Sequence, residues 1–547
     1  MNEMLESTPL KLNSTGCSTL SGSKKLTADV SVLELVCEHD ETFQQEQISS
    51  ASCDFKDSRL SKWNSRKTYL VWLLICFSTG PTAAMMRSYV PATIQTTAHA
   101  LGHPKGSSGP CLATGDDCYV TFGYGTVQYT SFSLYLKAIY TSLEGAIAIL
   151  MMAFADYSDY RKWLMIGATA SYGIFAIPFY WLSDTKKYQT LVQQSVLYCL
   201  LLCFGTIYQI TESSYIPVFM NARKLALQDE HNSKQGGVML RGVNVSTWGL
   251  VVGNIGGIIA SLVGVIITHA SSHPSNKDFL LAVTVAGFVT TFISIICANL
   301  IPSLKGKEFQ SKGVKDLLMM PLVRFKEIFM DLLDYREAFK FCVAWVLWNI
   351  AYSNFLSVFG LLFRSTMGIG TSDAEFSIWQ FMNLIVACLG PLCWMTFYSY
   401  SCSNKPSFYS ITYMKRSLYG MLLVGTFTNF WGCLGTNFNS KVGFKYRWEF
   451  WLFQIFFVST SSGIRTINRV AYSAMLPTGK ENQYFGFEVM LGLCTGWSES
   501  LIVALLQDKT GNSRMPFIPN TLLYLVALLL FFSVDVEKGM KQAGKCG

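Results

Sequence analysis

Several ionisable side chains stand inside long apolar runs of the sequence. Glu144 and Glu499 lie in the middle of two runs, Glu212 lies near the end of another, and Arg465 and Arg469 stand one helical turn apart. A charge at the centre of a membrane helix costs ~2.5–3.5 kcal/mol on insertion scales, so such residues usually serve a function. We expect Arg469 or Arg465 to bind a substrate carboxylate while a glutamate responds to protons. The alternative is that these groups pair across helices and only hold the bundle together.

Enzyme motifs are weak or missing. Gly496-Trp-Ser-Glu-Ser500 comes close to the Gly-x-Ser-x-Gly nucleophile elbow, which needs a strand-to-helix turn and a histidine partner. Here the serine falls inside an apolar run, and none of the apolar runs contains a histidine. No Gly-x-x-x-x-Gly-Lys-Ser/Thr phosphate loop occurs, which disfavours ATP-driven pumping. We therefore expect neither an enzyme, nor a bound cofactor, nor a metal centre.

The composition indicates a membrane protein. Half of the 547 residues are hydrophobic and 14% are charged, whereas soluble domains carry ~25% charged residues. The formal charge of +8 does not indicate nucleic-acid binding, because the basic residues gather in alternate loops as membrane orientation requires. The expected partners are the lipid bilayer and a small solute, with no nucleic acid.

Twelve apolar runs have about the ~20-residue length that a helix needs to cross a bilayer. They cover 68–92, 132–153, 163–182, 191–211, 245–267, 279–301, 341–363, 376–399, 417–434, 449–470, 485–506 and 517–534. The longest interior break, 302–340, separates six runs from six, as in a two-halved secondary transporter. The sequence predicts an all-α membrane protein of twelve transmembrane helices in two six-helix halves, 67–301 and 341–534.

The segments outside the halves are polar. Residues 1–66 are rich in Ser, Thr, Lys and Glu without an apolar period, and we predict a disordered tail. Lysine and arginine concentrate in alternate loops and in the 302–340 linker. This distribution favours a cytosolic position for both termini, including the 535–547 tail.

The 302–340 linker contains an amphipathic pattern. Leu322, Phe325, Phe329 and Leu332 recur at helical spacing, with charged residues between them. This predicts a helix that either lies along the inner membrane face or caps the bundle.

Glycine and cysteine positions add two local predictions. Gly249, Gly253 and Gly257 are four residues apart in one run, and small residues at this spacing let helices approach closely. Most of the 16 cysteines lie inside apolar runs, but Cys111 and Cys118 lie together in a polar loop. If the outer side is oxidising, we expect these two to form a disulfide.

One tight charged turn, Ala153-Phe-Ala-Asp-Tyr-Ser-Asp-Tyr-Arg-Lys162, joins the second and third runs. It resembles the loop between helices 2 and 3 of the major facilitator superfamily, Gly-x-x-x-Asp-Arg-x-Gly-Arg-Arg/Lys, with Asp156, Arg161 and Lys162 at charged positions. The resemblance implies an inner gate. We expect Asp156 near the N-terminus of the helix in 485–506, whose partial positive dipole favours a carboxylate. The alternative is a polar turn that only stops two helices.

Further motifs in the right order resemble the fungal autophagy-related protein 22, or vacuolar effluxer, family of that superfamily. The matching segments are Ser88-Tyr-Val-Pro91, Thr130-Ser-Phe-Ser-Leu-Tyr135, the stretch from Arg469 through Leu476-Pro477 to Trp497, and Thr510-Gly-Asn-Ser-Arg514. The resemblance covers nearly everything from 69 to 540.

The resemblance implies a multi-pass protein of the vacuole membrane that exports amino acids to the cytosol after autophagic breakdown. Neutral apolar and aromatic amino acids such as leucine, isoleucine and tyrosine are the implied substrates. Two halves rocking about a midplane cavity would perform the transport, with protons as a candidate coupling ion. Two alternatives remain: a non-transporting nutrient receptor or scaffold, and a facilitator for sugars or another small solute. The arginine pair weighs against sugars, whose sites usually present Gln, Asn and Trp.

Overall fold

A computed structural model describes the part of the chain that carries all twelve predicted spans. The described residues are 62–104, 111, 118–155, 160–213, 215, 216, 219, 236–269, 276–301, 314–369, 374–402, 407–437, 441–477 and 481–544. The predicted tail 1–66 falls outside this part, except for 62–66, which begin the first helix.

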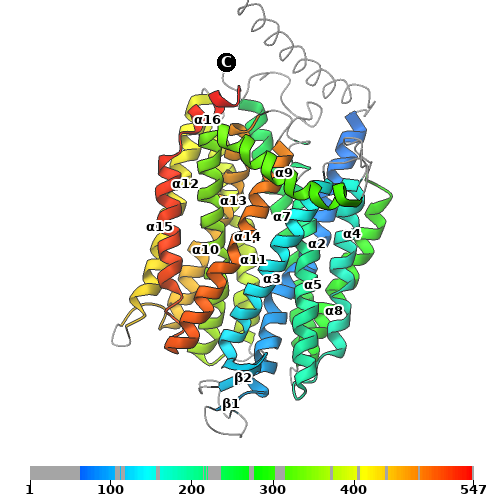
Figure 1. The fold of residues 1–547 in the computed structure, drawn as a ribbon, viewed down its shortest axis with the longest axis vertical. Coiled ribbons are helices and arrows are strands. Elements are labelled where there is room, and N and C mark those ends of the chain that lie inside the picture. The colour runs from blue at the N-terminus through cyan, green and yellow to red at the C-terminus, as the bar shows by residue number, and fades with distance from the viewer. Residues whose placement is uncertain are drawn as a thin grey trace, which may run out of the picture. The chain divides into compact units, whose positions relative to one another are not determined.

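Within the described residues, one long helix corresponds to each predicted span, in the same order (Figure 1). The first half contains α2 (Lys62–Ala100), α3 (Tyr129–Ala155), α4 (Tyr160–Ile174) with the 3₁₀ turn η1 (Ile177–Trp181), α5 (Tyr188–Ser213), α7 (Gly236–His269) and α8 (Asn276–Ala298). The second half contains α10 (Arg336–Met367), α11 (Ala374–Cys402), α12 (Ser407–Leu434), α13 (Arg447–Met475), α14 (Glu481–Thr510) and α15 (Phe517–Ser533). The predicted fold class is confirmed.

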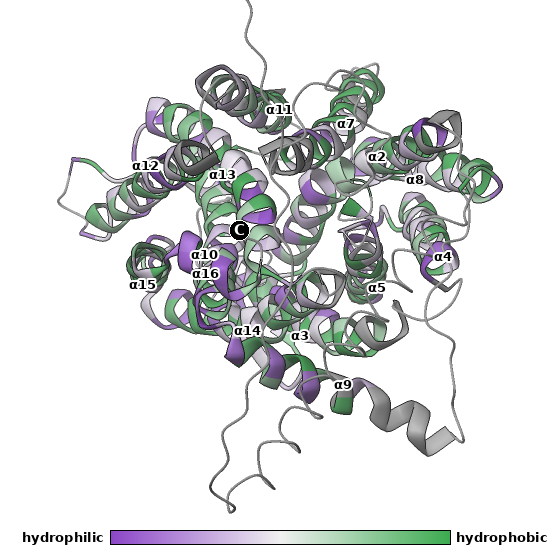
Figure 2. Ribbon diagram, turned by 90° about the horizontal axis from the view of Figure 1, so that it is seen from above, coloured by the Kyte–Doolittle hydropathy of each residue, from purple (hydrophilic) through white to green (hydrophobic). Residues whose placement is uncertain are grey.

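The outer surface of the helix bundle is apolar, as lipid contact requires. In the described part of the chain, nine helices are long and apolar enough to cross a membrane, and α15 with α16 (Val536–Gln542) forms a tenth candidate bent by 61°. Large apolar side chains such as Ile266, Phe292 and Leu529 are each 67% exposed, and a hydropathy-coloured view shows such residues around the bundle (Figure 2). Because water would penalise so much exposed apolar surface, these faces indicate contact with lipid acyl chains.

The first half packs through glycines. A Cβ at Gly80 of α2 would lie 2.0 Å from the carbonyl oxygen of Gly253 in α7, and one at Gly249 would lie 2.7 Å from the ring of Trp72. Gly173 of α4 and Gly287 of α8 make a second backbone contact of the same kind. The predicted close packing along α7 is therefore present, with α2 as the partner helix.

The second half packs through aromatic rings. Phe355 of α10 stacks on Phe457 of α13 with ring centroids 4.0 Å apart. One helical turn along α10, Phe359 contacts Phe450 at 5.3 Å, and Phe363 stacks on Trp379 of α11 at 4.9 Å. Aromatic pairs in these geometries add about 0.5–1.5 kcal/mol each beyond the area that they bury.

The linker helix α9 (Val314–Asp334) caps the bundle. Phe325 and Phe329 stack on Phe487 of α14 at 5.6 and 6.1 Å, and Leu332 is fully buried. The hydroxyl of Tyr484 donates a 2.6 Å hydrogen bond to Asp331. The sequence left two placements open, along the inner membrane face or over the end of the bundle. The structure shows the second, because the apolar face of α9 packs on α3, α10 and α14.

The two ends of the bundle differ. The end that carries α9 and α16 is called the α9 end, and the opposite end, with a small antiparallel sheet, is called the sheet end (Figure 1). The sheet contains β1 (His103–Pro104), β2 (Cys118–Phe122) and β3 (Gly125–Gln128), and β3 leads directly into α3. Its β2–β3 hairpin turns at Gly123, whose φ of 60° suits glycine.

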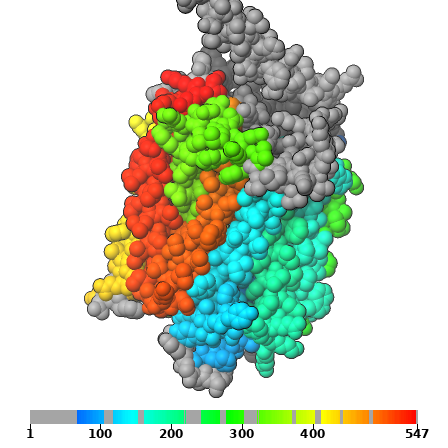
Figure 3. Space-filling model, in the orientation of Figure 1, coloured from blue at the N-terminus to red at the C-terminus, as the bar shows by residue number. Residues whose placement is uncertain are grey.

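A tight seam joins the halves. Helices α3 and α14 run side by side over much of their length (Figure 3). A Cβ on Gly145 of α3 would lie 3.0 Å from the backbone of Cys494 in α14. This approach brings the ionisable residues of the two helices into one neighbourhood.

Candidate functional site between the two halves

The five ionisable residues singled out from the sequence lie on four different helices. Glu144 lies on α3, Glu212 on α5, Arg465 and Arg469 on α13, and Glu499 on α14. All five are buried or half-buried. Each is considered below with the groups that surround it.

An ion pair joins the halves toward the α9 end. Arg469 Nη2 lies 4.0 Å from Glu212 Oε2, and the two side chains are 18% and 8% exposed. The hydroxyl of Ser213 donates a long 3.4 Å hydrogen bond to the same carboxylate. Arg469 therefore has a counter-ion from the opposite half in this conformation and does not need a ligand to balance its charge.

Arg465, one turn earlier on α13, has a different environment. Its guanidinium lies over the ring of Tyr352 in α10, 4.5 Å from the centroid. Its Nε finds no hydrogen-bond acceptor among the described residues. An arginine held by an aromatic face keeps its hydrogen-bonding edge for a further partner.

Arg87 of α2 interacts with ionisable groups of both halves. Its side chain is exposed although Met86 and Ser88 on either side are buried. It interacts electrostatically with Glu144 of the first half and with Arg465 of the second half. The surroundings of the exposed Arg87 side chain, with Glu144 and Arg465, are called the central space below. Two guanidinium groups thus approach this central space from opposite halves.

Glu144 is buried at the edge of this neighbourhood. Its Oε1 accepts a 2.8 Å hydrogen bond from the hydroxyl of Thr206 in α5. It also interacts electrostatically with Lys137 and Arg87. These contacts leave Glu144 as an acidic group beside the cationic central space.

In the described part of the predicted runs, three buried ionisable residues were missed from the sequence, and one of them, Glu449 at the start of α13, is fully buried. Lys137 of α3 is 4% exposed, and Glu488 of α14 is 5% exposed and accepts a 3.1 Å hydrogen bond from Asn468 of α13. Both stand within the apolar runs 132–153 and 485–506. As with Glu144, the sequence shows a charged residue inside an apolar run. Each of the two lies near the start of its run, however, and a charge at that place is readily interpreted as the boundary of the helix.

Only part of the predicted inner gate can be placed. Asp156 lies outside the described residues. Arg161 and Lys162 begin α4, where the Arg161 guanidinium lies 5.8 Å from the ring centroid of Tyr215 and the Lys162 ammonium lies 5.3 Å from that of Trp163. The assignment of these residues to a gate remains a prediction.

Three hydrogen bonds join the halves at the sheet end. The guanidinium of Arg364 in α10 donates to Gln95 of α2 at 2.6 Å. The amide of Gln507 in α14 donates to the hydroxyl of Thr130 in α3 at 2.9 Å, and the backbone N–H of Gln128 donates to the neighbouring Asp508 at 3.1 Å.

The sheet end also holds a disulfide between Cys111 and Cys118, the pair singled out from the sequence. A nitrogen of His99 lies within 4.8 Å of both sulfur atoms. Sulfurs joined to each other are not thiolate ligands, so this group does not form a metal site while the disulfide is intact.

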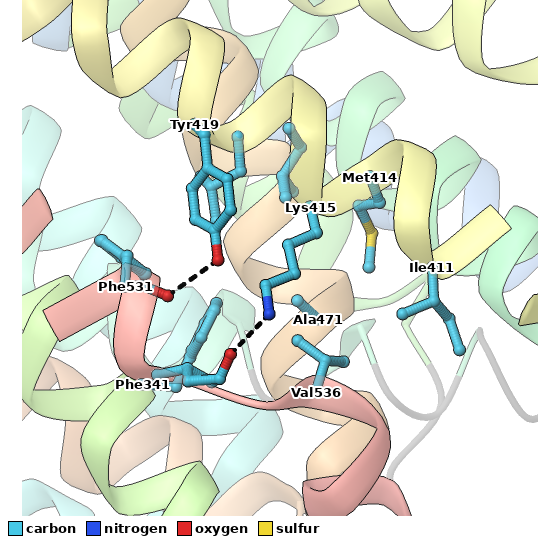
Figure 4. A pocket seen from close by; sticks show the side chains of 11 residues that line it. Phe341, Ile411, Met414, Lys415, Tyr419, Ala471, Phe531 and Val536 are labelled. Atoms are coloured by element: carbon cyan, nitrogen blue, oxygen red, sulfur yellow. Dashed lines mark hydrogen bonds between the residues drawn. The ribbon is translucent and has the colours of Figure 1, made fainter. Parts of the chain in front are cut away.

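A small crevice of about 10 Å³ lies elsewhere, within the second half (Figure 4). Its lining is apolar apart from Lys415 and Tyr419 of α12, which donate hydrogen bonds to the carbonyl oxygens of Val534 and Phe531. Because both polar groups are already bonded, the crevice offers no unpaired group to a polar substrate.

Sequence comparison identifies relatives over most of the chain. Residues 64–544 match the family model described as "Vacuole effluxer Atg22 like". The autophagy-related protein 22 of Candida albicans is 43% identical over 89% of this chain and 93% of its own length. The protein of the same name from Saccharomyces cerevisiae strain S288c is 23% identical over 86% of this chain and 92% of its own length.

Solved structures share the architecture. The human organic anion transporter MFSD10 (TETRAN) matches with a TM-score of 0.54 and 12% identity, over 85% of this chain and 99% of its own. The proton:xylose symporter XylE of E. coli, a major facilitator superfamily protein, matches with a TM-score of 0.54 and 11% identity, over 86% and 95%. At these identities the likeness concerns the fold alone. The family match over residues 64–544 shows that the chain belongs to the Atg22-like vacuole effluxer family, and its fold is the one seen in major facilitator transporters.

Proposed function

We propose that this chain exports amino acids from the vacuole lumen to the cytosol by alternating access, and that the central space binds them. The observation that carries the proposal is the pair of guanidinium groups, Arg87 and Arg465, that reach this space from opposite halves. Two like charges that approach each other repel unless an anion lies between them. A substrate carboxylate is such an anion, and arginine binds carboxylates with two parallel hydrogen bonds.

The neighbouring groups suit the rest of an α-amino acid. Glu144, close to Arg87, would attract the substrate ammonium group. The aromatic ring of Tyr352, beneath Arg465, offers an apolar wall to a leucine or tyrosine side chain. An organic anion without an amino group would leave Glu144 unused, so the arrangement favours a zwitterion over a simple anion.

The proposed orientation places the α9 end in the cytosol. The loops at this end and the 302–340 linker hold most of the basic residues, as the positive-inside rule requires. Export would then need the sheet end to close after loading and the α9 end to open. Asp156, Arg161 and Lys162 remain our proposed gate at the α9 end, with Asp156 attracted by the N-terminus of α14.

Flux of labelled leucine or tyrosine out of liposomes that contain the purified protein tests this function, with and without a proton gradient. Replacing Arg465 by alanine should reduce flux by about 30-fold or more, because truncating one partner of a buried charge pair costs ~2–5 kcal/mol. Replacing Arg447, an exposed arginine on the same helix that pairs with Glu375, should leave flux unchanged. Normal flux in the Arg465 variant would exclude it from substrate binding, and binding of leucine without flux would favour a receptor.

A further inference from the structure

Lys137 connects the two halves on the sheet-end side of α3. Its ammonium donates hydrogen bonds of 2.9 Å to the carbonyl oxygen of Ser353 and 2.8 Å to the hydroxyl of Ser357. Both acceptors lie on α10, in the opposite half, and Lys137 itself lies on α3 with 4% exposure. The only oxygens that bind this buried ammonium in the described part of the chain are uncharged.

Two buried carboxylates lie near the same ammonium. Lys137 interacts electrostatically with Glu499 of α14 and with Glu144, two turns along its own helix. Glu499 is 5% exposed, and neither of its oxygens accepts a hydrogen bond of standard geometry. The side-chain nitrogen of Asn354 lies nearby but is also without an acceptor. A buried carboxylate whose polar neighbour is neutral, as Asn354 is, is costly when charged, so protonation of Glu499 or attraction of Lys137 lowers the energy.

The remaining ionisable groups around this cluster are few. They are Arg87 on α2, Tyr140 on α3, Tyr172 on α4, Tyr198, Cys199 and Cys203 on α5, and Tyr524 on α15. On α10, the residues next to Lys137 and Glu499 are Ser353, Asn354 and Ser357, which are polar but do not titrate. The contacts of α9 with α3 and α14 are at the α9 end, away from this cluster. Lys137 is therefore the cation that both carboxylates share.

We propose that Lys137 couples proton binding by Glu144 and Glu499 to closure of the sheet end. When a carboxylate is protonated, its attraction for the ammonium falls, and Lys137 keeps its bonds to Ser353 and Ser357. When both carboxylates are charged, they draw Lys137 along α3 and α14, and α10 is released. The step involves only an O–H bond made or broken on a carboxylate and a change of hydrogen-bond partner for the ammonium.

The position of the hydrogen bonds from Lys137 to Ser353 and Ser357 indicates which end of the bundle protonation closes. Lys137 stands on the sheet-end side of α3, and Ser353 and Ser357 stand on the α10 segment that leads to the sheet end. A proton that arrives from that end would thus close it. The inference rests on the proposed function for its physiological meaning, because export from an acidic compartment would then carry a proton with the substrate.

The distance between spin labels on the two halves tests the coupling in the full-length protein. Labels at Tyr124 and Lys441, both exposed at the sheet end, are introduced after serine has replaced Cys393, which is the exposed free cysteine of the described residues, and the cysteines whose side chains are not described: Cys17, Cys37, Cys53, Cys402 and Cys546. The measurement is made in lipid nanodiscs at about pH 5 and about pH 8. The ratio of the closed to the open population should fall by about tenfold from the lower to the higher pH. A carboxyl group whose pKa differs by about one unit between two conformations changes their population ratio by about that factor. The Lys137→Met protein should show less than about a threefold change over the same range.

Lys415→Met is the matched control. Lys415 also donates from its ammonium to a backbone carbonyl, that of Val534, but within the second half alone. This variant should keep the full pH response. An unchanged pH response in Lys137→Met would overturn the proposal, as would an equal loss in both lysine variants.

Two further variants apply if Lys137→Met does not fold. Ser357→Ala removes one acceptor of Lys137 without changing any charge and should shift the populations toward the open state at every pH. Glu499→Gln mimics permanent protonation and should keep the sheet end closed at about pH 8. The coupling would be rejected if both variants had the same open and closed populations as the unmodified protein. A protein that moves no amino acid but shows these population changes would disprove the proposed function and leave the coupling in place.

Discussion

The two ends of the bundle are held together across the halves by different forces. At the sheet end, the bonds between Gln95 and Arg364, Thr130 and Gln507, and Gln128 and Asp508 are 2.6–3.1 Å long. Toward the α9 end, the side-chain link between the main bodies of the halves in the described residues is the 4.0 Å ion pair of Glu212 and Arg469. In the described residues, short hydrogen bonds join the halves at the sheet end, and a longer ion pair joins them toward the α9 end.

The difference determines how each end separates. A hydrogen bond weakens steeply once the distance or the angle leaves a narrow range. The energy between two charges falls only in inverse proportion to distance, so an ion pair continues to attract as it lengthens. We therefore expect the sheet end to open in an all-or-none manner and the α9 end to widen gradually.

Spin-label distances at each end measure these two behaviours. Tyr124 and Lys441 report on the sheet end, and Lys67 and Lys541 report on the α9 end; all four are exposed. Each change below is compared with the labelled protein that carries no other substitution.

The largest effect is expected for Glu212→Ala. It leaves Arg469 buried without a counter-ion when the α9 end is closed, which costs ~3–5 kcal/mol. The open population at Lys67 and Lys541 should rise by about 100-fold or more. The double variant with Arg469→Ala should return most of the way to the original ratio, and failure to do so would show that the two residues do not act as a pair.

A smaller effect at the opposite end is expected for Arg364→Ala. Its bond to Gln95 involves a charged donor, and such bonds contribute ~1.5–3 kcal/mol. The open population at Tyr124 and Lys441 should rise about tenfold to 100-fold, with two separate distance peaks and no intermediate one. A single broad distribution that shifts continuously would contradict the all-or-none behaviour.

Thr130→Val tests a neutral bond at the same end. The valine keeps the volume of threonine but cannot accept the hydrogen bond from Gln507, and a neutral bond contributes ~1 kcal/mol. The open population should rise about fivefold. No response at Tyr124 and Lys441 would mean that this bond persists in the open state.

The smallest change is expected for Asp508→Asn. The asparagine oxygen can still accept from the backbone of Gln128, so only the contribution of the charge is lost, on the order of 0.5 kcal/mol. The open population should rise about twofold, and the effect should disappear at high salt because the site is partly exposed. An effect as large as that of Arg364→Ala would assign Asp508 a second partner.

Hydropathy alone predicted the helices and the division into halves, because a bilayer allows few other structures for such runs. Helix α13 was predicted correctly, although it is not among the described helices that are long and apolar enough by themselves to cross a membrane. Its arginines lower its hydropathy, and they are the same residues that indicated a function. The cap by α9 was one of two open placements, since an amphipathic face does not say whether lipid or protein covers it.

The pairing of the ionisable residues could not be predicted. Glu212 and Arg469 are far apart in the sequence, and only the packing of α5 near α13 makes them partners. Lys137 was missed because it lies near the start of its apolar run, and its role could not be predicted because its acceptors in α10 carry no charge. The separate environments of Arg465 and Arg469 depend on the ring of Tyr352, which spacing along α13 does not reveal.

The glycine contact between α2 and α7 has a consequence for how sequences of this family can diverge. With the backbone of Gly253 where a Cβ of Gly80 would be, neither helix has room to slide along the other. A homologue with a larger residue at the position of Gly80 must carry α7 farther away along its whole length. Because the clash at Gly80 is with backbone atoms, no substitution at Gly253 relieves it, and the position of Gly80 should remain glycine across species whatever residue stands at position 253.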